Sequence, residues 1–383
     1  MNSKKIEEAL QERILILDGA MGTAIQQKNL PDEAFCLQDE AGTDIARRGN
    51  NDLLCITRPE VVRSIHQAYI DAGADIITTN TFGANRISQK EYGMAHLAAR
   101  MNIEGAAIAR QAADNCKQRR VWVAGSMGPT SKTLSLATDM NHPELQDVDF
   151  ESMAQAYHEQ AKALMAGGAD MLLLETCFDA LNTKAALYAI LQLNNELGRT
   201  VPVMVSATIN DRSGRTLTGQ TLEAFYTSIA HYPILSFGIN CSFGVTELRP
   251  FIERLADMVP CHISLYPNAG LPNEMGEYDE MPEFTARHIK DMAEAGLLNI
   301  AGGCCGTNEQ HIKAIADALQ GVAPRKLPQK DNRLVVSGLE RVVIDKATTG
   351  FINIGERTNV AEKHPQVVYE LQNILRKERN RSK

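Results

Sequence analysis

The segment Ala72-Gly73-Ala74-Asp75-Ile76-Ile77 recurs in the chain as Gly167-Gly168-Ala169-Asp170-Met171-Leu172 and, more loosely, as Gly296-Leu297-Leu298-Asn299-Ile300. Each copy places a glycine turn between the end of a helical stretch and an apolar run that begins a strand. The repeated unit is therefore a helix, a turn and a buried strand. Repetition of this unit predicts an α/β fold built on a parallel sheet.

Eight apolar runs bounded by Gly, Pro and polar turns are expected to be strands. Their residues are continuously apolar rather than alternating, as in parallel strands that are covered on their outer face. Amphipathic helical stretches separate them, among them Pro59–Ala72 and Ser152–Ala166. The expected strands are Ile14–Leu17, Asp75–Thr79, Val121–Ala124, Met171–Glu175, Val201–Ala207, Ile234–Ile239, His262–Tyr266 and Leu298–Ala301.

Eight such units over roughly 300 residues fit a (β/α)8 TIM barrel. A doubly wound open sheet is the competing interpretation, and we favour the barrel because eight units fill it with no strand left over. We expect the barrel over residues 1–322 and a proline-rich, charged linker over 323–350. A short C-terminal extension over 351–383 ends in a helix-like tail and is too short to build a domain of its own.

Composition excludes several classes of function. The 383 residues carry a net charge of −8, whereas a nucleic-acid partner normally requires a basic face. No secretory signal and no run long enough to span a membrane is visible, so we expect a soluble, cytoplasmic protein without membrane partners. Eight cysteines are too sparse for a disulfide framework and indicate burial, metal binding or catalysis instead.

Polar and glycine residues follow every expected strand, at the end of a barrel where chemistry gathers. Three cysteines stand there: Cys241 after the sixth strand, and the adjacent pair Cys304 and Cys305 after the eighth. Three thiolates favour zinc and leave a fourth position for a ligand, and a substrate thiol suits that position.

The alternative is that these cysteines are merely buried in the core. A vicinal pair inside a glycine run has few side chains around it, which favours the metal. Cys177 is a weaker fourth candidate, and the remaining cysteines are expected to be structural: Cys36, Cys55, Cys116 and Cys261.

The turn that follows the first strand suits an amino acid as ligand. Backbone N–H groups of Gly19 and Ala20, before a helix expected at Thr23–Gln27, could hold a carboxylate, and Asp18 or Glu175 could accept from an ammonium. Asp18 as a helix N-cap and Glu175 as a paired interior acid are the alternatives. Glycine-rich turns of this kind also hold phosphates, so the ligand class stays open at this point.

Five motifs follow one another at the strand ends: Leu17-Asp18-Gly19-Ala20-Met21-Gly22-Thr23, Thr79-Asn80-Thr81-Phe82, Leu174-Glu175-Thr176, Gly238-Ile239-Asn240-Cys241 and Gly302-Gly303-Cys304-Cys305-Gly306-Thr307. In sequence and in order, these motifs resemble the homocysteine S-methyltransferase family. Two further segments at 211–220 and 266–273 support the resemblance, which covers roughly residues 10–325 and is strongest to the N-terminal homocysteine-binding module of cobalamin-dependent methionine synthases.

The resemblance implies a zinc-dependent (β/α)8 barrel that activates homocysteine as a thiolate for methyl transfer. The zinc ligands would be Cys241, Cys304 and Cys305, and Asn240 would support them from behind. The ends of homocysteine would be held by Asp18, Gly19, Ala20 and Glu175.

Two departures from the family pattern are visible. Thr79 stands where the cobalamin-dependent synthases often carry a glutamate. The segment from Phe351 to Val360 resembles the start of a folate-binding barrel whose remainder is missing, as is any cobalamin-binding Asp-x-His-x-x-Gly motif. The chain is therefore interpreted as a stand-alone or truncated form of the homocysteine half.

The methyl donor is open at the level of sequence. Kinship with the synthases favours methylcobalamin, or methyl derived from methyltetrahydrofolate, supplied by a separate cobalamin- or folate-binding protein. Betaine or S-methylmethionine is the alternative, and few aromatics at the strand ends weigh against betaine. A non-catalytic remnant that binds homocysteine or zinc is the alternative from another class, and the intact site residues argue against it.

Overall fold

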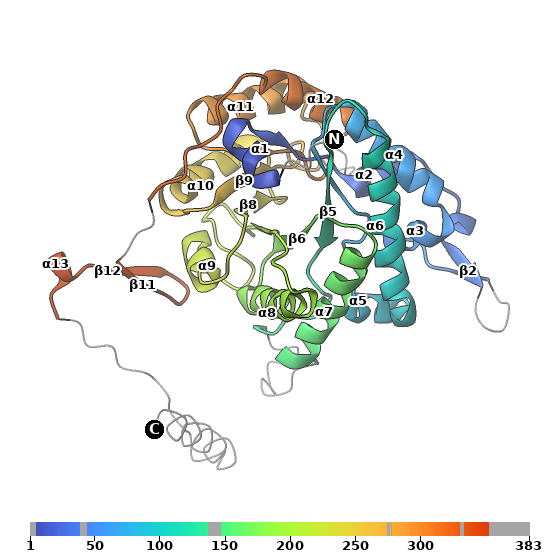
Figure 1. Cartoon of the computed structure of the whole chain (residues 1–383), viewed down its shortest axis with the longest axis horizontal. Coiled ribbons are helices and arrows are strands. Elements are labelled where there is room, and N and C mark those ends of the chain that lie inside the picture. Colours follow the sequence, from blue (N-terminus) through green and yellow to red (C-terminus); the bar gives the residue numbers. More distant parts are fainter. Residues whose placement is uncertain are drawn as a thin grey trace, which may run out of the picture. The chain divides into compact units, whose positions relative to one another are not determined.

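A computed structural model describes residues 5–38, 44–136, 147–273, 276, 278–329 and 333–351. Eight parallel strands stand in the order β1-β10-β9-β8-β7-β6-β5-β4, and a parallel bridge between Leu17 and Ile76 joins the two outermost strands. The sheet is thereby closed into a (β/α)8 barrel, and the open-sheet alternative is excluded (Figure 1). The strands are β1 (Leu15–Ile16), β4 (Ile76–Thr78), β5 (Trp122–Met127), β6 (Met171–Cys177), β7 (Val203–Ala207), β8 (Ser236–Asn240), β9 (His262–Tyr266) and β10 (Ile300–Ala301).

Helices cover the outside of the barrel and alternate with the strands along the chain (Figure 1). The longer ones are α2 (Met21–Gln27), α4 (Pro59–Asp71), α6 (Ala98–Asn115), α7 (Phe150–Ala166), α8 (Ala180–Leu197), α9 (Leu222–Ile229), α10 (Val245–Met258), α11 (Pro282–Glu294) and α12 (Glu309–Ala318). Shorter elements are α3 (Leu54–Thr57), α5 (Arg86–Glu91), the 3-10 helices η1 (Asp32–Phe35), η2 (Asn51–Leu53) and η3 (Ala95–Leu97), and the antiparallel pair β2 (Cys36–Gln38) and β3 (Asp44–Ala46).

Two apolar layers follow from the alternation of side chains along each strand. Inward residues such as Leu15, Trp122 and Met204 form one buried cluster, which also contains Ile6 and Leu10 of α1 (Ile6–Glu12). Outward residues pack against the helices in a second, larger cluster. Because α1 shares the inner cluster with Trp122 at the start of β5, this helix covers the N-terminal end of the barrel and leaves the C-terminal end open.

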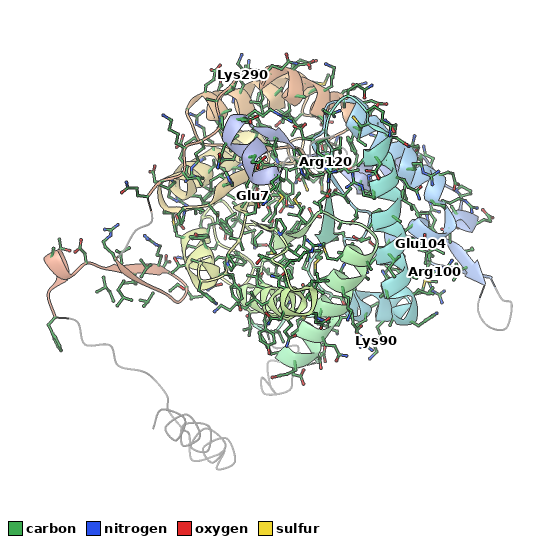
Figure 2. All side chains as sticks on the ribbon, in the orientation of Figure 1. Glu7, Lys90, Arg100, Glu104, Arg120 and Lys290 are labelled. Atoms are coloured by element: carbon green, nitrogen blue, oxygen red, sulfur yellow. The ribbon has the colours of Figure 1, made fainter. Side chains whose placement is uncertain are left out.

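Charged residues of the helices point away from this core. Arg100 and Glu104 on α6 are exposed at the outer surface (Figure 2). In the part of the chain that the structure describes, no helix is both long and apolar enough to cross a membrane.

All eight expected strands are confirmed, with bounds that differ by at most a few residues. The Pro59–Ala72 helix is α4, which ends at Asp71, and the Ser152–Ala166 helix is α7, which begins two residues earlier because Asp149 caps it through Ser152 N–H. The helix expected at Thr23–Gln27 begins at Met21.

Chain contacts divide the molecule into two units, residues 1–342 and 343–383. Within the stretch expected to be a linker, β11 (Leu334–Ser337) pairs with β12 (Arg341–Ile344), followed by α13 (Lys346–Thr349). Arg325 is buried and donates to the carbonyls of Ala256, Val259 and Cys261, which fixes the start of that stretch on the barrel. Of the extension expected at 351–383, residues 352–383 lie outside the described chain.

Candidate metal centre and amino-acid pocket

Three cysteine sulfurs converge at the open end of the barrel. Sγ atoms of Cys241, Cys304 and Cys305 all lie within 4.8 Å of one another, and those of Cys241 and Cys305 are 3.8 Å apart. Among the described residues, this is the only cluster of three or more His, Cys, Asp or Glu side chains close enough to hold a metal. The structure thus brings together the three thiols that the sequence singled out.

Unusual backbone conformations aim these thiols. Cys241 and Ser242 have positive φ angles of 63° and 68°, which turn the chain sharply at the end of β8. Such angles are costly for residues with a side chain and are found where a site requires them. After β10, a Cβ on Gly303 would lie 2.4 Å from Thr307 Oγ1, so only glycine fits directly before the cysteine pair. Cys304 N–H then donates to Pro267 O at 2.7 Å, which fixes the first thiol of the pair.

The thiols match the demands of zinc. Two sulfur ligands of a tetrahedral zinc, with bonds of about 2.3 Å, are separated by about 3.8 Å. Thiol contacts from Cys304 and Cys305 lower the pKa of Cys241, whereas the same contacts with Cys241 raise the pKa of Cys304 and of Cys305. Ionisation of one thiol therefore disfavours ionisation of its two neighbours, and a cation at their centre would offset this repulsion.

Asp18 lies beside the thiols as a buried acid. Its carboxylate accepts from Thr78 N–H at 2.8 Å and from the Thr78 hydroxyl, and burial raises its pKa well above the ordinary value. The N-cap of α2 is Ala20, so Asp18 does not cap this helix and the structural alternative for it is excluded. Gly19 and Ala20, like Asp18, line a cavity at the mouth of the barrel. The N–H of Ala20 donates to Thr307 Oγ1 at 3.3 Å.

Glu175 is the second acid of the site. It accepts from the Ser126 hydroxyl, and burial raises its pKa to about 7. Neither Glu175 nor Asp18 forms a salt bridge with a basic side chain of the described chain. Two acids without a basic partner, facing one cavity, favour a cationic ligand group such as an ammonium.

Asn240 links the acid to the thiols. Its side-chain oxygen accepts from Thr176 N–H and its amide nitrogen donates to Thr176 Oγ1, both at 2.9 Å, while the same nitrogen lies 3.8 Å from Cys304 Sγ. Thr176 itself has a positive φ of 57°, so Asn240 holds a strained residue that directly follows Glu175. Asn240 therefore contacts both the segment that carries Glu175 and the Cys304 thiol, without being a metal ligand itself.

One cavity of about 560 Å³ opens at the barrel mouth, and Asp18, Glu175 and the three cysteines line it. Its lining also includes a buried, hydrogen-bonded network of Asn50, Asp52 and Gln89. A volume of this size is typical of a pocket for a small molecule. The cavity extends well past the acids and thiols, so it has room for a second reactant.

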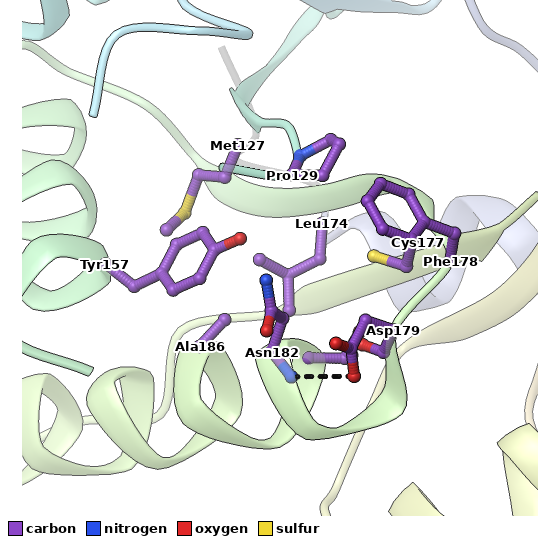
Figure 3. A pocket seen from close by; sticks show the side chains of 10 residues that line it. Met127, Pro129, Tyr157, Leu174, Cys177, Phe178, Asp179, Asn182 and Ala186 are labelled. Carbon is purple, nitrogen blue, oxygen red and sulfur yellow. Dashed lines mark hydrogen bonds between the residues drawn. The ribbon is translucent and has the colours of Figure 1, made fainter. Parts of the chain in front are cut away.

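Cys177, the weaker fourth candidate for a metal ligand, lies elsewhere. Its side chain lines a separate cavity of only about 10 Å³ with Met127, Tyr157 and Asn182, as Figure 3 shows. Burial raises the pKa of Cys177 to about 12, which keeps it a neutral thiol. Cys177 is therefore a core residue, and Cys36, Cys55, Cys116 and Cys261 also stand outside the metal cluster.

Several site residues escaped the sequence-based prediction. Thr78 and Ser126 hold the two acids, and Tyr266 lines the cavity beside Cys304. Their position at strand ends was the one sequence feature that could have indicated a role in the site. A hydroxyl at a strand end, however, does not indicate which acid it contacts. Thr79, the departure from the family pattern, is hydrogen-bonded within the barrel. Its hydroxyl lies 2.6 Å from Thr81 Oγ1 and accepts from the N–H of Ser126 on the neighbouring strand β5 at 2.9 Å.

Comparison with solved structures returns the same barrel. The homocysteine methyltransferase MmuM from Escherichia coli in its oxidized form superposes with a TM-score of 0.60 at 23% identity, over 79% of this chain and 95% of that one. Its metallated form gives a TM-score of 0.60 at 22% identity, over 80% and 96% of the two chains. At these identities the likeness establishes the fold.

The sequence model of one family, homocysteine S-methyltransferase, matches residues 15–319. This range begins with β1 and ends just after α12, so it contains the whole barrel and every residue of the site described above. The chain belongs to the homocysteine S-methyltransferase family.

Proposed function

We propose that this protein transfers a methyl group to the sulfur of homocysteine, forming methionine, with a zinc ion held by Cys241, Cys304 and Cys305. The observation that carries the proposal is the convergence of these thiols, at the spacing that tetrahedral zinc requires, beside two acids that lack a basic partner. A resident zinc would supply attraction for the substrate sulfur and so lower the pKa of its thiol.

The chain's own residues would bind and orient the amino acid. Asp18 and Glu175 face the cavity and would accept from the ammonium, with Thr78 and Ser126 holding their carboxylates in place. The turn at Gly19 and Ala20 would face the carboxylate. The anchored substrate would then direct its sulfur toward the three cysteines and expose it to the methyl group on the open side of the cavity.

The first test is metal content together with activity. The purified protein is expected to hold about one zinc per chain, and Cys304→Ala should lose both the metal and methyl transfer. Cys177→Ala, a thiol of the core, is the matched control and should keep both. Full activity in a zinc-free Cys304→Ala protein would sink the proposal.

Methylcobalamin is the proposed donor, presented by a separate cobalamin- or folate-binding protein or added in solution. The wide cavity supports a large reactant. Betaine is the less favoured donor because two of the four strand-end aromatics, Phe178 and Phe243, do not line the cavity, where Phe82, Tyr92 and Tyr266 do.

A panel of donors with homocysteine separates the alternatives. Turnover with methylcobalamin supports a methionine synthase-type enzyme, and turnover with S-methylmethionine alone would identify a different donor for the same zinc site. Tight homocysteine binding without turnover from any donor would favour the non-catalytic alternative.

A further inference from the structure

Two segments at the barrel mouth carry the two halves of the candidate site. The Asp18 segment, residues 18–23, follows β1, and the cysteine segment, residues 302–307, follows β10 and contains Cys304 and Cys305. Strands β1 and β10 are parallel neighbours in the sheet. The two segments therefore leave the barrel side by side, and the contacts between them set the distance from the acid to the thiols.

Glycine allows the bases of the two segments to touch. A Cβ on Gly302 would lie 2.7 Å from Leu17 Cβ and 2.8 Å from Leu17 O, so a larger residue would push the backbones apart. Gly303 N–H donates to Asp18 O at 3.2 Å. Backbone contact thus joins the segments where they emerge from the strands.

Two threonine hydroxyls join the segments farther along the chain. Thr23 Oγ1, on the Asp18 segment, accepts from Gly306 N–H at 3.0 Å. In the other direction, Thr307 Oγ1 accepts from Ala20 N–H at 3.3 Å and donates to Cys304 O at 2.7 Å. One oxygen atom of Thr307 is therefore hydrogen-bonded to the backbone of a proposed substrate contact and to that of a proposed zinc ligand.

Burial makes the Thr307 hydroxyl hard to replace. Its side chain has no exposed surface, so no water can take over its hydrogen bonds. A valine would place a methyl group where the hydroxyl oxygen lies 2.7 Å from Cys304 O. Carbon and carbonyl oxygen normally stay at least about 3.3 Å apart, so the valine would push the Cys304 backbone away.

We propose that Thr307 is a positioning residue that selects the length of the substrate's side chain. The proposal rests on the proposed function, in which the charged ends of the amino acid lie at the Asp18 segment and its sulfur lies at the cysteines. Because one hydroxyl fixes the two segments relative to each other, the span between these ends is constant. The side chain of homocysteine covers this span, whereas cysteine, one methylene shorter, falls short of it.

Calorimetric titration of the zinc-loaded chain with L-homocysteine and with L-cysteine tests the proposal. The unaltered chain should bind L-homocysteine about 100-fold more tightly, which is within the range that one methylene contributes to discrimination. In Thr307→Val we expect this ratio to fall to about tenfold, because the displaced cysteine segment weakens the binding of homocysteine. Thr307→Ser retains the hydroxyl and should restore the ratio.

Thr183→Val is the matched control. Thr183 is a buried threonine of α8 whose hydroxyl donates to Asp179 O at 2.9 Å, and it does not line the mouth cavity. The ratio should be unaltered in this variant. L-2-aminobutyrate, which is homocysteine without its thiol, engages the Asp18 segment alone and should bind Thr307→Val as it binds the unaltered chain. Zinc content should also stay at about one per chain.

An unaltered ratio in Thr307→Val would overturn the proposal and leave homocysteine methylation intact. Binding of L-2-aminobutyrate that weakens as much as that of homocysteine would overturn it too, since the damage would then lie at the amino-acid end. Absence of homocysteine binding to the unaltered chain would instead contradict the proposed function. If Thr307→Val does not fold, Thr23→Ala, which removes the other hydroxyl, should lower the ratio, and an unaltered ratio there would overturn the proposal.

Discussion

Asp18 is a buried acid that has no ion pair with a basic side chain of the described chain, and burial raises its pKa well above the ordinary value. If it accepts from the substrate ammonium, Asp18→Asn removes one charge-assisted hydrogen bond and keeps the shape of the side chain. We expect KM for homocysteine to rise about 10- to 100-fold, with zinc content unchanged. Steady-state kinetics and metal analysis check this.

Asp211→Asn is the matched control, since Asp211 is an exposed acid on the loop after β7 and does not line the mouth cavity. KM should be unaltered there. An Asp18→Asn protein with unchanged KM would remove Asp18 from substrate binding.

Asn240 acts on the metal through its neighbours rather than as a ligand. It fixes the strained Thr176 and reaches Cys304 Sγ, so Asn240→Ala frees both. Loss of such a supporting contact commonly weakens metal binding about 10- to 100-fold. Competition with a zinc chelator should show this weakening, whereas zinc affinity equal to that of the unaltered protein would contradict the role.

For single residues of the site, the sequence predicts those with a distinctive chemistry and does not predict the common hydroxyl residues that hold them. Vicinal cysteines in a glycine run and acids at strand ends are rare patterns, so Cys304, Cys305 and Asp18 stand out. Thr78 and Ser126 do not, because threonine and serine are common at strand ends. Their role depends on which strands become neighbours, and that is a property of the closed barrel.

The turn after β10 carries two of the three thiols, and its path depends on Gly303. A Cβ at this position would lie 2.4 Å from Thr307 Oγ1. We expect Gly303→Ala to displace the turn, lower the free energy of unfolding by about 1–3 kcal/mol and reduce zinc content. Chemical denaturation and metal analysis measure the two effects.

Gly338→Ala provides the comparison for that substitution. A Cβ at Gly338 has no neighbour within 4 Å and the residue has no positive φ, so its stability should stay within about 0.5 kcal/mol of the original. Equal effects of the two substitutions would mean that the close contact at Gly303 is not what matters.

Elements of the barrel are predictable because each strand is a short apolar run between glycine turns, and the outer helices have one apolar stripe. The exact ends of the helices and strands are less predictable. Helix α7 begins at Phe150 because the Asp149 carboxylate accepts from Ser152 N–H, a local contact that the periodicity of apolar residues does not predict. The β11–β12 pair was missed because Leu334-Val335-Val336 lies in a polar, proline-rich stretch. Its partner strand β12 begins only four residues after β11 ends, whereas the contact of Leu339 O with Thr221 N–H is a long-range feature.

For the whole molecule, the buried His66 predicts sensitivity to acid. Neither ring nitrogen has a partner in the described chain, and burial lowers the pKa of His66 to about 4. The unfolded chain binds this proton near pH 6.5, so stability falls as the pH drops below about 6.5 and the loss is complete below about 4. The contribution amounts to about 3 kcal/mol.

Denaturant unfolding between pH 7 and pH 4 tests this expectation. His66→Leu should flatten the decline, whereas His231→Leu, at an exposed histidine, should leave it unchanged. A decline of equal size in His66→Leu would contradict the assignment to this side chain.

X-ray absorption at the zinc edge tests most directly whether the three cysteines form a metal centre whose open position takes the substrate. The account predicts three sulfur ligands in the purified protein and a fourth on addition of homocysteine. A shell of four chain ligands that homocysteine leaves unchanged, or a zinc without sulfur neighbours, would contradict it.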